Sequence, residues 1–394
     1  MKTTQSINMR IFLSCLQSKV KHPIPAYQFW EVYFKNGIEE AGHEWLDSEE
    51  VDWAEGLVHL DEESLIQWRD RTWSIVVSTI KKKHKENPIH LFLSYLFPKQ
   101  VNPDAIREIQ DLGIPCVNFY CDNVRDFVKI PKAFYCFDLN WVPEYKALKM
   151  YESAGLKYIF APMPVWIPLK LRNSDHIEKY GVSFIGSRDT QREALLSEVL
   201  RSNVRLEIRG VGWSHDESFP SKSDVGVFNL QKTATNQLEF IRSQGMLAWL
   251  RKISARSLPN IADEIFAGFV KRQPDAEEYP LIIQQSIVTL GINRYPSYRH
   301  PFSNPDKYSR MRDIEAPMMG ACYLTEWTEG LEQLYEIGKE IETYSSAEEM
   351  IAKISMLCAD TRKRKEMRRL AQKRSLQEHT FTNSITRISQ ILEC

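Results

Sequence analysis

The segment 182–192, Val-Ser-Phe-Ile-Gly-Ser-Arg-Asp-Thr-Gln-Arg, has the pattern of a strand, a Gly-Ser turn and the start of a helix. Gly186 would let a ligand approach the backbone closely, and amides at a helix start suit a phosphate. The guanidinium groups of Arg188 and Arg192 match phosphate oxygens in geometry. With Ser187 in the turn, the segment predicts a phosphate-binding loop, and the alternative is an ordinary turn with solvated arginines.

A second set of ionisable residues lies in the stretch 310–320, directly before the apolar run 321–325. Arg312 and Glu315 are three residues apart, so on a helix they share one face. A helical carboxylate that faces a ligand can accept hydrogen bonds from two hydroxyls of a ribose. The alternative is a surface ion pair, which contributes only a few tenths of a kcal/mol.

The elements that must position these residues alternate between short apolar runs and helical patterns. Continuous apolar runs of this kind are typical of parallel strands buried on both faces. Strands are predicted at 10–16, 90–96, 115–120, 133–137, 158–161, 182–185, 204–208 and 321–325. Helices are predicted at 27–41, twice within 48–86, and at 103–113, 143–155, 190–201, 305–319 (capped by Asn304) and from 347 onward. Another apolar run spans 282–290.

The prolines at 162, 164 and 168 predict a stiff linker. We therefore expect a Rossmann-like domain at 1–165, a linker at 166–180 and a second Rossmann-like domain at 181–394, with the last helix a candidate to cross back. Such α/β halves bind ligands beyond the carboxyl ends of their strands, which predicts a site in a cleft between two facing domains.

Composition narrows the functional classes. The 394 residues carry a net charge of −1, which does not indicate a nucleic-acid partner. Seven scattered cysteines without CxxC spacing predict neither a disulfide framework nor a zinc site. No apolar run approaches the ~18 residues of a membrane span, and no signal peptide is evident, so we expect a cytoplasmic protein.

The second half resembles the glycosyltransferase-like domain of the CgeB spore-maturation family, within the wider superfamily of glycosyltransferases with two Rossmann-like domains (GT-B). The residues that carry this resemblance occur in the family's order over about 181–390: 183–187 with Arg192, 290–294, 312–317 with Gly320, 338–340 and 378–381. The first half resembles the family more weakly, through its strand pattern, Asp122 and the pair Phe137-Asp138.

The resemblance implies an enzyme that transfers a sugar from a nucleotide diphosphate to a glycan or lipid-linked acceptor, as in polysaccharide biosynthesis. A catalytically inactive nucleotide- or glycan-binding protein on the same fold is the alternative. An NAD-dependent enzyme would need GxGxxG after the first strand, and that turn holds no glycine.

For the donor, the resemblance implies that Glu315 contacts the ribose and that the loop at Gly186 faces the phosphates. The predicted donor-binding residues are Gly186, Ser187, Arg188, Arg192, Asn293, Arg294, Arg312, Glu315 and Gly320. Retaining members often carry a second glutamate eight residues before the first, where this chain has Lys307, so the stereochemical outcome stays open. The chain has no Asp-x-Asp motif. Because arginines and helix dipoles can neutralise a diphosphate, we predict no cofactor and no essential metal.

An inverting enzyme would need a base in the first half to take the proton of the acceptor hydroxyl. The candidates are Asp122 and Asp138, each expected at a strand's carboxyl end, and His22 in the first strand-to-helix loop.

The stretch 362–374 carries eight basic residues and one acidic residue. This predicts peripheral contact with an anionic membrane surface, at the inner face of the membrane, and the alternative is a solvated helix face.

Overall fold

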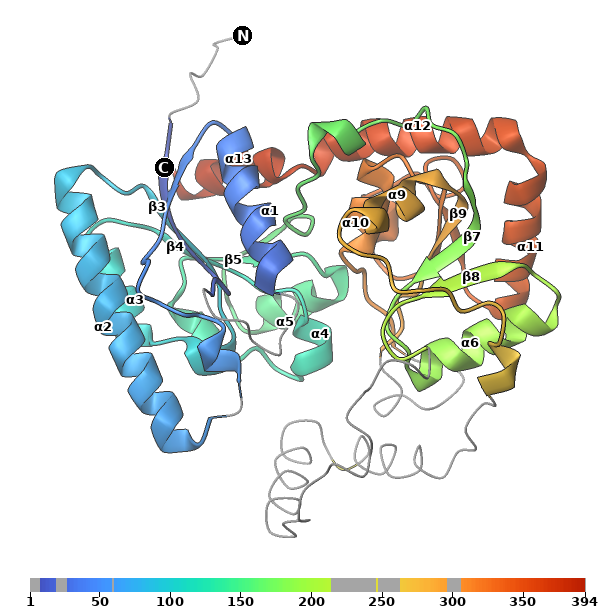
Figure 1. The fold of residues 1–394 in the computed structure, drawn as a ribbon. Coiled ribbons are helices and arrows are strands. Elements are labelled where there is room, and N and C mark those ends of the chain that lie inside the picture. Colours follow the sequence, from blue (N-terminus) through green and yellow to red (C-terminus); the bar gives the residue numbers. More distant parts are fainter. Residues whose placement is uncertain are drawn as a thin grey trace. The chain divides into compact units, whose positions relative to one another are not determined.

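The computed structural model describes residues 8–18, 27–58, 60–213, 246, 263–295 and 306–393. The chain divides into two compact units, each built on its own sheet (Figure 1). Unit 1 holds residues 1–166 together with 378–394, and unit 2 holds residues 167–377. Within the described residues, no helix combines the length and the apolar character that crossing a membrane requires.

Unit 1 has a six-stranded sheet in which every paired neighbour is parallel, in the order β2-β1-β3-β4-β5-β6. Its strands are β1 Arg10–Cys15, β2 Glu44–Leu46, β3 Leu91–Tyr95, β4 Cys116–Phe119, β5 Leu139–Val142 and β6 Tyr158–Phe160. β3, β4 and β5 are buried at every residue, as their continuous apolar sequence predicts.

The helices of unit 1 are α1 Tyr27–Glu40, α2 Glu62–Glu86, α3 Pro103–Gln110, α4 Asn123–Asp126, α5 Leu148–Ser153 and α13 Phe381–Leu392. Side chains cap their starts: Asp61 accepts from the amide of Ser64, and Asn102 accepts from the first amides of α3. Short 3₁₀ turns complete the unit at η1 Glu55–Leu57, η2 Pro98–Gln100, η3 Lys132–Cys136 and η4 Tyr145–Ala147.

The C-terminal helix α13 packs on α1 within unit 1. The ring of Phe381 lies edge-on to Phe34 and to Trp141, with centroids 5.6 and 5.8 Å apart. A Cβ at Gly37 would lie only 2.4 Å from the Phe381 ring, so α1 needs a glycine there for the close approach.

Unit 2 has a five-stranded sheet of parallel neighbours in the order β11-β10-β9-β7-β8. Its strands are β7 Tyr180–Ile185, β8 Leu206–Arg209, β9 Ser286–Gly291, β10 Tyr323–Glu326 and β11 Glu342–Tyr344. The chain runs from β7 outward to β8 and then returns to β9 on the other side of β7. The strand order therefore reverses between β7 and β9, the place where open parallel sheets bind ligands.

The helices of unit 2 are α6 Thr190–Arg201, α9 Glu278–Gln285, α10 Arg312–Met318, α11 Ala347–Ala359 and α12 Thr361–Glu378, with 3₁₀ turns at η5 Leu169–Leu171, η7 Asp263–Ile265 and η8 Leu331–Gln333. One apolar cluster joins α6, the central strands, α11 and Met367 of α12. The segment from residue 167 to β7 packs on the unit's interior, where the Gln284 amide donates to the backbone of Leu171 and Asn173.

Three local predictions are wrong. Residues 133–137 fall largely within the 3₁₀ turn η3, and the next strand is β5. The stretch 48–86 holds one long helix, α2, after a short turn. The helix predicted over 305–319 begins only at Arg312, because Arg294 and Lys307 form an extended bridge before it. The stretch 282–290 is half helix α9 and half strand β9; Asn304 and much of 225–272 lie outside the described residues.

Candidate functional site

The loop that follows β7 is held tightly at the point where the strand order reverses. The Gly186 amide donates to the Arg209 carbonyl at 2.9 Å, and its carbonyl accepts from the Trp213 indole at 2.7 Å. A Cβ on Gly186 would lie 2.8 Å from the Phe184 ring and 3.3 Å from a guanidinium nitrogen of Arg192. The glycine therefore serves close packing in the loop.

Arg192 folds back over this loop. Its Nη1 donates to the carbonyl and the hydroxyl of Ser187, at 2.7 and 3.0 Å, and its Nε pairs with Asp189 at 3.3 Å. Asp189 is the N-cap of α6 and accepts from the amides of Gln191 and Arg192. Because this cap occupies both amides, the guanidinium groups are the stronger candidates for binding an anion.

Arg188 turns to a different set of partners. Its Nε pairs with Glu193, and its guanidinium lies 5.7 Å from the ring of Trp213 and 5.6 Å from that of Phe266. The structure thus places Arg188 in the loop itself, in a packed environment separate from that of Arg192, which lies in α6.

Asn293 and Asp313 tie the end of β9 to the start of α10. Asn293, which is 1% exposed, donates from its amide to Asp313, Thr325 and the Glu326 carbonyl. Asp313 is fully buried and accepts five hydrogen bonds, from Asn293, Ser309, the Arg310 amide, Tyr323 and Thr325. Burial raises the pKa of Asp313, and the hydrogen bonds oppose that shift. The two side chains act as a structural tie, so Asn293 directs its amide into the protein.

Glu326, the last residue of β10, is a fully buried carboxylate between two cations. Arg294 donates to both of its oxygens, with the shortest contact at 2.6 Å, and Lys307 lies 3.3 Å from Oε1. Burial lowers the pKa of Arg294, but its hydrogen bonds to Glu326 and the charge of that carboxylate outweigh this effect and leave the pKa raised. Lys307 is therefore part of an ion-pair network.

Arg310 and Arg312 complete a group of cations beside the loop. Arg310 donates to the Arg294 carbonyl at 3.0 Å, and its Nε is buried without a hydrogen-bond partner among the described residues. Both arginines affect the pKa of Arg192. Burial lowers this pKa, and the charges of Arg310 and Arg312 lower it further, to about 10, although the charge of Asp189 acts in the opposite direction. The positive charges of Arg310 and Arg312 therefore lie close enough to Arg192 to repel its guanidinium.

Glu315 lies under this group and is only 2% exposed. Its Oε2 accepts from the Tyr279 hydroxyl at 2.6 Å and pairs with Arg312 Nε at 3.4 Å. The Arg312 guanidinium lies 5.0 Å from the Tyr279 ring. A ligand hydroxyl that donated to Oε2 of Glu315 would compete with the hydroxyl of Tyr279.

Gly320 lies apart from the other predicted donor residues. It precedes β10 and so lies at the amino end of the strands, whereas the loop at Gly186 lies at the carboxyl end. Its φ is +77°, and a Cβ there would lie 2.8 Å from Ser174 and 3.1 Å from the Gln372 amide. A turn with positive φ and tight packing explains this glycine without a ligand.

In unit 1, Asp122 follows β4 at the carboxyl edge of the sheet and lies 3.8 Å from Arg125. Sequence reasoning missed its neighbour Glu144, which follows β5 at the same edge and is 1% exposed. Glu144 Oε2 accepts from the Val124 amide at 3.3 Å, and Oε1 has no hydrogen-bond partner among the described residues. Burial, with the charge of Asp122 next, raises the pKa of Glu144 well above its usual value. The sequence does contain a clue to this residue, because Glu144 is a carboxylate that follows the apolar run 139–142 by two residues.

Neither of the other two candidate bases is found beside Asp122 in the described part of the chain. Asp138 lies before β5, at the opposite edge of the sheet, because the strand expected before it is the turn η3. Its Oδ2 accepts from the Cys116 amide at 2.7 Å and from the Gln110 side chain at 2.9 Å, a structural role. His22 lies outside the described residues.

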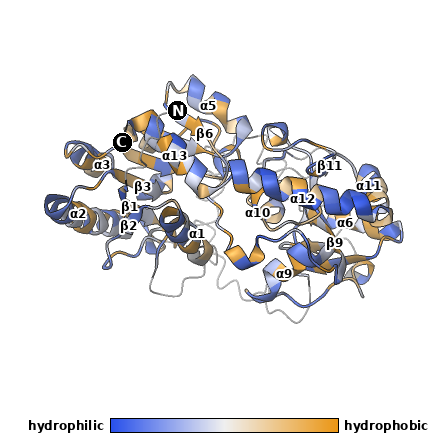
Figure 2. Cartoon of the chain, turned by 90° about the horizontal axis from the view of Figure 1, so that it is seen from above, coloured by the Kyte–Doolittle hydropathy of each residue, from blue (hydrophilic) through white to orange (hydrophobic). Residues whose placement is uncertain are grey.

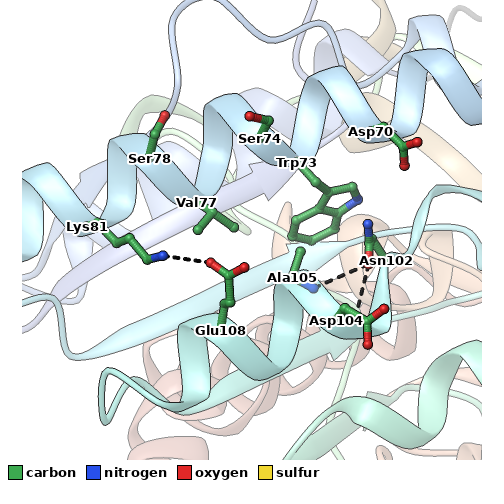
Figure 3. A pocket seen from close by; sticks show the side chains of 10 residues that line it. All are labelled: Asp70, Trp73, Ser74, Val77, Ser78, Lys81, Asn102, Asp104, Ala105 and Glu108. Carbon is green, nitrogen blue, oxygen red and sulfur yellow. Dashed lines mark hydrogen bonds and ion pairs between the residues drawn. The ribbon is translucent and has the colours of Figure 1, made fainter.

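A surface hollow of about 420 Å³ lies between α2 and α3 of unit 1 (Figure 3). Polar side chains that line it have partners within the protein. Asn102 caps α3, and Lys81 pairs with Glu108 at 2.7 Å. None of the predicted site residues lines it. Among the described residues, no group of His, Cys, Asp and Glu side chains is arranged to hold a metal ion.

Several solved structures share this architecture, one of them a glycosyltransferase by name. HepE of Anabaena in complex with UDP-glucose superposes with a TM-score of 0.56 at 12% identity, covering 98% of this chain and 99% of that one. Sucrose-phosphate synthase of Thermosynechococcus elongatus gives 0.57 at 12% identity over 98% and 99% of the chains. A glycosyltransferase of Rickettsia africae gives 0.56 at 10% identity over 98% of each. No curated protein sequence matches the chain.

The two parallel α/β sheets thus define a GT-B fold, which confirms the fold class expected from the sequence. The glycosyl transferase-like family matches residues 191–390, about half of the chain. The chain belongs to this glycosyl transferase-like family.

Proposed function

We propose that the chain is a glycosyltransferase, of the CgeB-like kind, that takes its sugar from a nucleotide diphosphate bound at the carboxyl edge of the unit 2 sheet. The observation that carries this proposal is the group of Arg192, Arg310 and Arg312 beside the loop at Gly186. In this group the charges of Arg310 and Arg312 repel Arg192, and the Nε of Arg310 is buried without a hydrogen-bond partner among the described residues. A diphosphate would relieve that repulsion and accept from the buried Nε of Arg310.

The ribose would meet Glu315. A carboxylate has about four acceptor positions, so Glu315 can keep Arg312 while a ribose hydroxyl replaces the hydroxyl of Tyr279. In this proposal Arg294 and Lys307 orient the group through Glu326, and Ser187 holds Arg192. Asn293 supports the fold around the site, Arg188 fixes the outer part of the loop, and Gly320 serves a turn at the opposite end of the strands.

During transfer, the acceptor hydroxyl would attack the anomeric carbon while the bond from that carbon to the diphosphate oxygen breaks. Negative charge then grows on the diphosphate, and the arginines would stabilise it without a metal. Asp122 is the proposed base for the acceptor proton, with the buried Glu144 beside it. The acceptor is proposed to be a glycan or a lipid-linked sugar.

The test begins with thermal unfolding of the full chain in the presence of nucleoside diphosphates and nucleotide sugars. A ligand that binds only the folded state at about 100 times its Kd adds about 2.7 kcal/mol of stability. We expect a nucleoside diphosphate and its sugar to raise Tm, with EDTA leaving the shift unchanged.

Turnover is the second readout. Candidate glycan and lipid-linked acceptors are added to the stabilising nucleotide sugar, and we expect acceptor-dependent release of the nucleoside diphosphate. Stabilisation without release for any acceptor would identify a binding protein instead. No shift with any nucleotide would contradict the donor site itself.

A further inference from the structure

Folding separates the basic residues of α12 into two groups. Four of the eight lie in ion pairs within unit 2: Arg364 and Arg368 with Glu178, Lys363 with Glu342, and Arg374 with Glu340. The other four are exposed and form no ion pair among the described residues: Arg362, Lys365, Arg369 and Lys373. Their spacings of three, four and four residues place them on one face of the helix. The sequence alone could not tell these two groups apart.

The segment 169–178 packs along the same helix. Glu178 pairs with Arg364 at 2.8 Å and with Arg368 at 3.0 Å, and His176 contacts Arg368 through its ring nitrogen. Between those two anchored residues, Ile177 is 77% exposed. An exposed aliphatic side chain therefore lies next to a charged helix, on a backbone that two ion pairs hold in place.

The apolar exposure of this segment stands out within the molecule. Ile177 and Leu169, at 77% and 79%, are the two most exposed large hydrophobic side chains among the described residues. Lys170 and Lys179 beside them are also exposed, whereas the exposed acids of this segment and of α12 are Asp175, Glu366 and Glu378. The balance of charge is therefore positive, and α12 is coloured hydrophilic over most of its length (Figure 2).

We infer that this face of unit 2, made of the exposed basic residues of α12 with Ile177 and Leu169, docks on an anionic lipid bilayer. A polybasic surface is attracted to anionic headgroups, and exposed aliphatic side chains gain by entering the interface. A nucleic acid would be recognised by cations together with aromatic stacking or base-edge contacts, and Ile177 and Leu169 offer neither. The two features together therefore favour lipid.

The test uses the full chain and sedimentation with vesicles, once with phosphatidylcholine alone and once with an equimolar mixture of phosphatidylcholine and phosphatidylglycerol. We expect binding to the mixed vesicles only, and weaker binding as salt increases. The double variant Lys365→Glu with Arg369→Glu should bind at least about thirtyfold more weakly, the factor that two basic residues contribute at such a surface. Ile177→Ser should weaken binding without changing its salt dependence.

The matched control reverses two exposed lysines on a helix of unit 1, Lys82→Glu with Lys85→Glu, which changes the net charge equally. This variant should bind the mixed vesicles like the parent. Equal loss in both double variants would show a net-charge effect and overturn the inference, as would a parent chain that stays in the supernatant. A DNA oligonucleotide could instead compete with the vesicles for the chain and bind the parent and Ile177→Ser equally well. That result would show a surface for polyanions in general and would overturn the inference. Unchanged Tm and nucleotide response in the variants keep this test separate from the proposed donor site.

Discussion

The side-chain amide of Asn293 donates a hydrogen bond of 3.0 Å to Oδ2 of Asp313, which ties the end of β9 to the first turn of α10. The chain between them includes residues outside the described part, yet both side chains are almost completely buried. Asp313 in turn fixes the Arg310 amide. The position of the arginine group thus depends on a buried polar network rather than on the helix alone.

Replacing Asp313 with alanine should destabilise unit 2 strongly. Five donors would lose their acceptor in a buried site, and each unsatisfied buried group costs about 1–3 kcal/mol. Because such losses are not additive, we expect about 3–5 kcal/mol in denaturant unfolding. Asp313→Asn should recover part of this, and equal stability of Asp313→Ala and the parent would contradict the network's role.

The ion pairs of Glu326 and of Glu108 offer a direct comparison. Glu326→Ala leaves the half-buried Arg294 and Lys307 without their carboxylate, which should cost about 3–5 kcal/mol of unfolding free energy. Glu108→Ala breaks only the exposed pair with Lys81 and should cost about 1 kcal/mol or less. Urea unfolding of both variants measures the difference, and similar losses would argue against burial as the cause.

Removing one of the repelling arginines should separate binding from stability. Arg310→Gln relieves repulsion on Arg192, so the ligand-free chain should unfold at the same or a slightly higher temperature. Its affinity for a nucleoside diphosphate should fall about tenfold or more, since charged hydrogen bonds contribute about 1.5–3 kcal/mol. Calorimetric titration gives the affinity, with Arg188→Gln as the control that keeps the arginine group intact. Undiminished affinity in Arg310→Gln would remove Arg310 from the donor site.

The pair Glu315 and Tyr279 tests the ribose contact. Glu315→Ala should lose the thermal stabilisation given by the nucleotide while the chain still folds. Tyr279→Phe removes the donor that now occupies the carboxylate, so it should bind the nucleotide as well as the parent or better. If both variants respond to nucleotide like the parent, the ribose contact is misplaced.

Glu144 predicts a dependence of stability on pH. Its pKa in the folded chain is raised, chiefly by burial, so the folded state holds its proton more tightly than the unfolded state does. The stability it contributes is present below the unfolded pKa and is lost as pH rises through the folded pKa. The nearby charged and titratable groups are Asp122, Asp126, Cys121 and Tyr151.

Glu144→Gln keeps the shape but cannot ionise, so its unfolding free energy should change less with pH than that of the parent. Urea unfolding from acid to alkaline pH measures both curves, with Asp138→Asn as the comparison at the other edge of the sheet. Parallel curves for parent and Glu144→Gln would show that Glu144 does not hold a proton on folding.

The sequence by itself determined the two parallel α/β sheets and the strand-to-helix turn at Gly186. Buried parallel strands form from continuous apolar runs, and α6 begins at its cap residue Asp189. Residues that are neighbours in the sequence are therefore enough to predict the strands and this helix start. Periodicity could not separate α9 from β9, which share one apolar run. A continuous apolar run has neither the helical period nor the alternation of a strand, so the two elements look alike in the sequence.

Only the tertiary structure decided what each polar side chain does. The residue types at Asn293, Arg312 and Lys307 are compatible with ligand binding or with a buried network, and the partners that choose between them lie far along the chain. Asn293 meets Asp313, Lys307 meets Glu326, and Glu144 lies beside Asp122 because neighbouring strands end at one edge. Hydrogen bonds and ion pairs depend on distances of a few ångströms, which the order of residues does not contain.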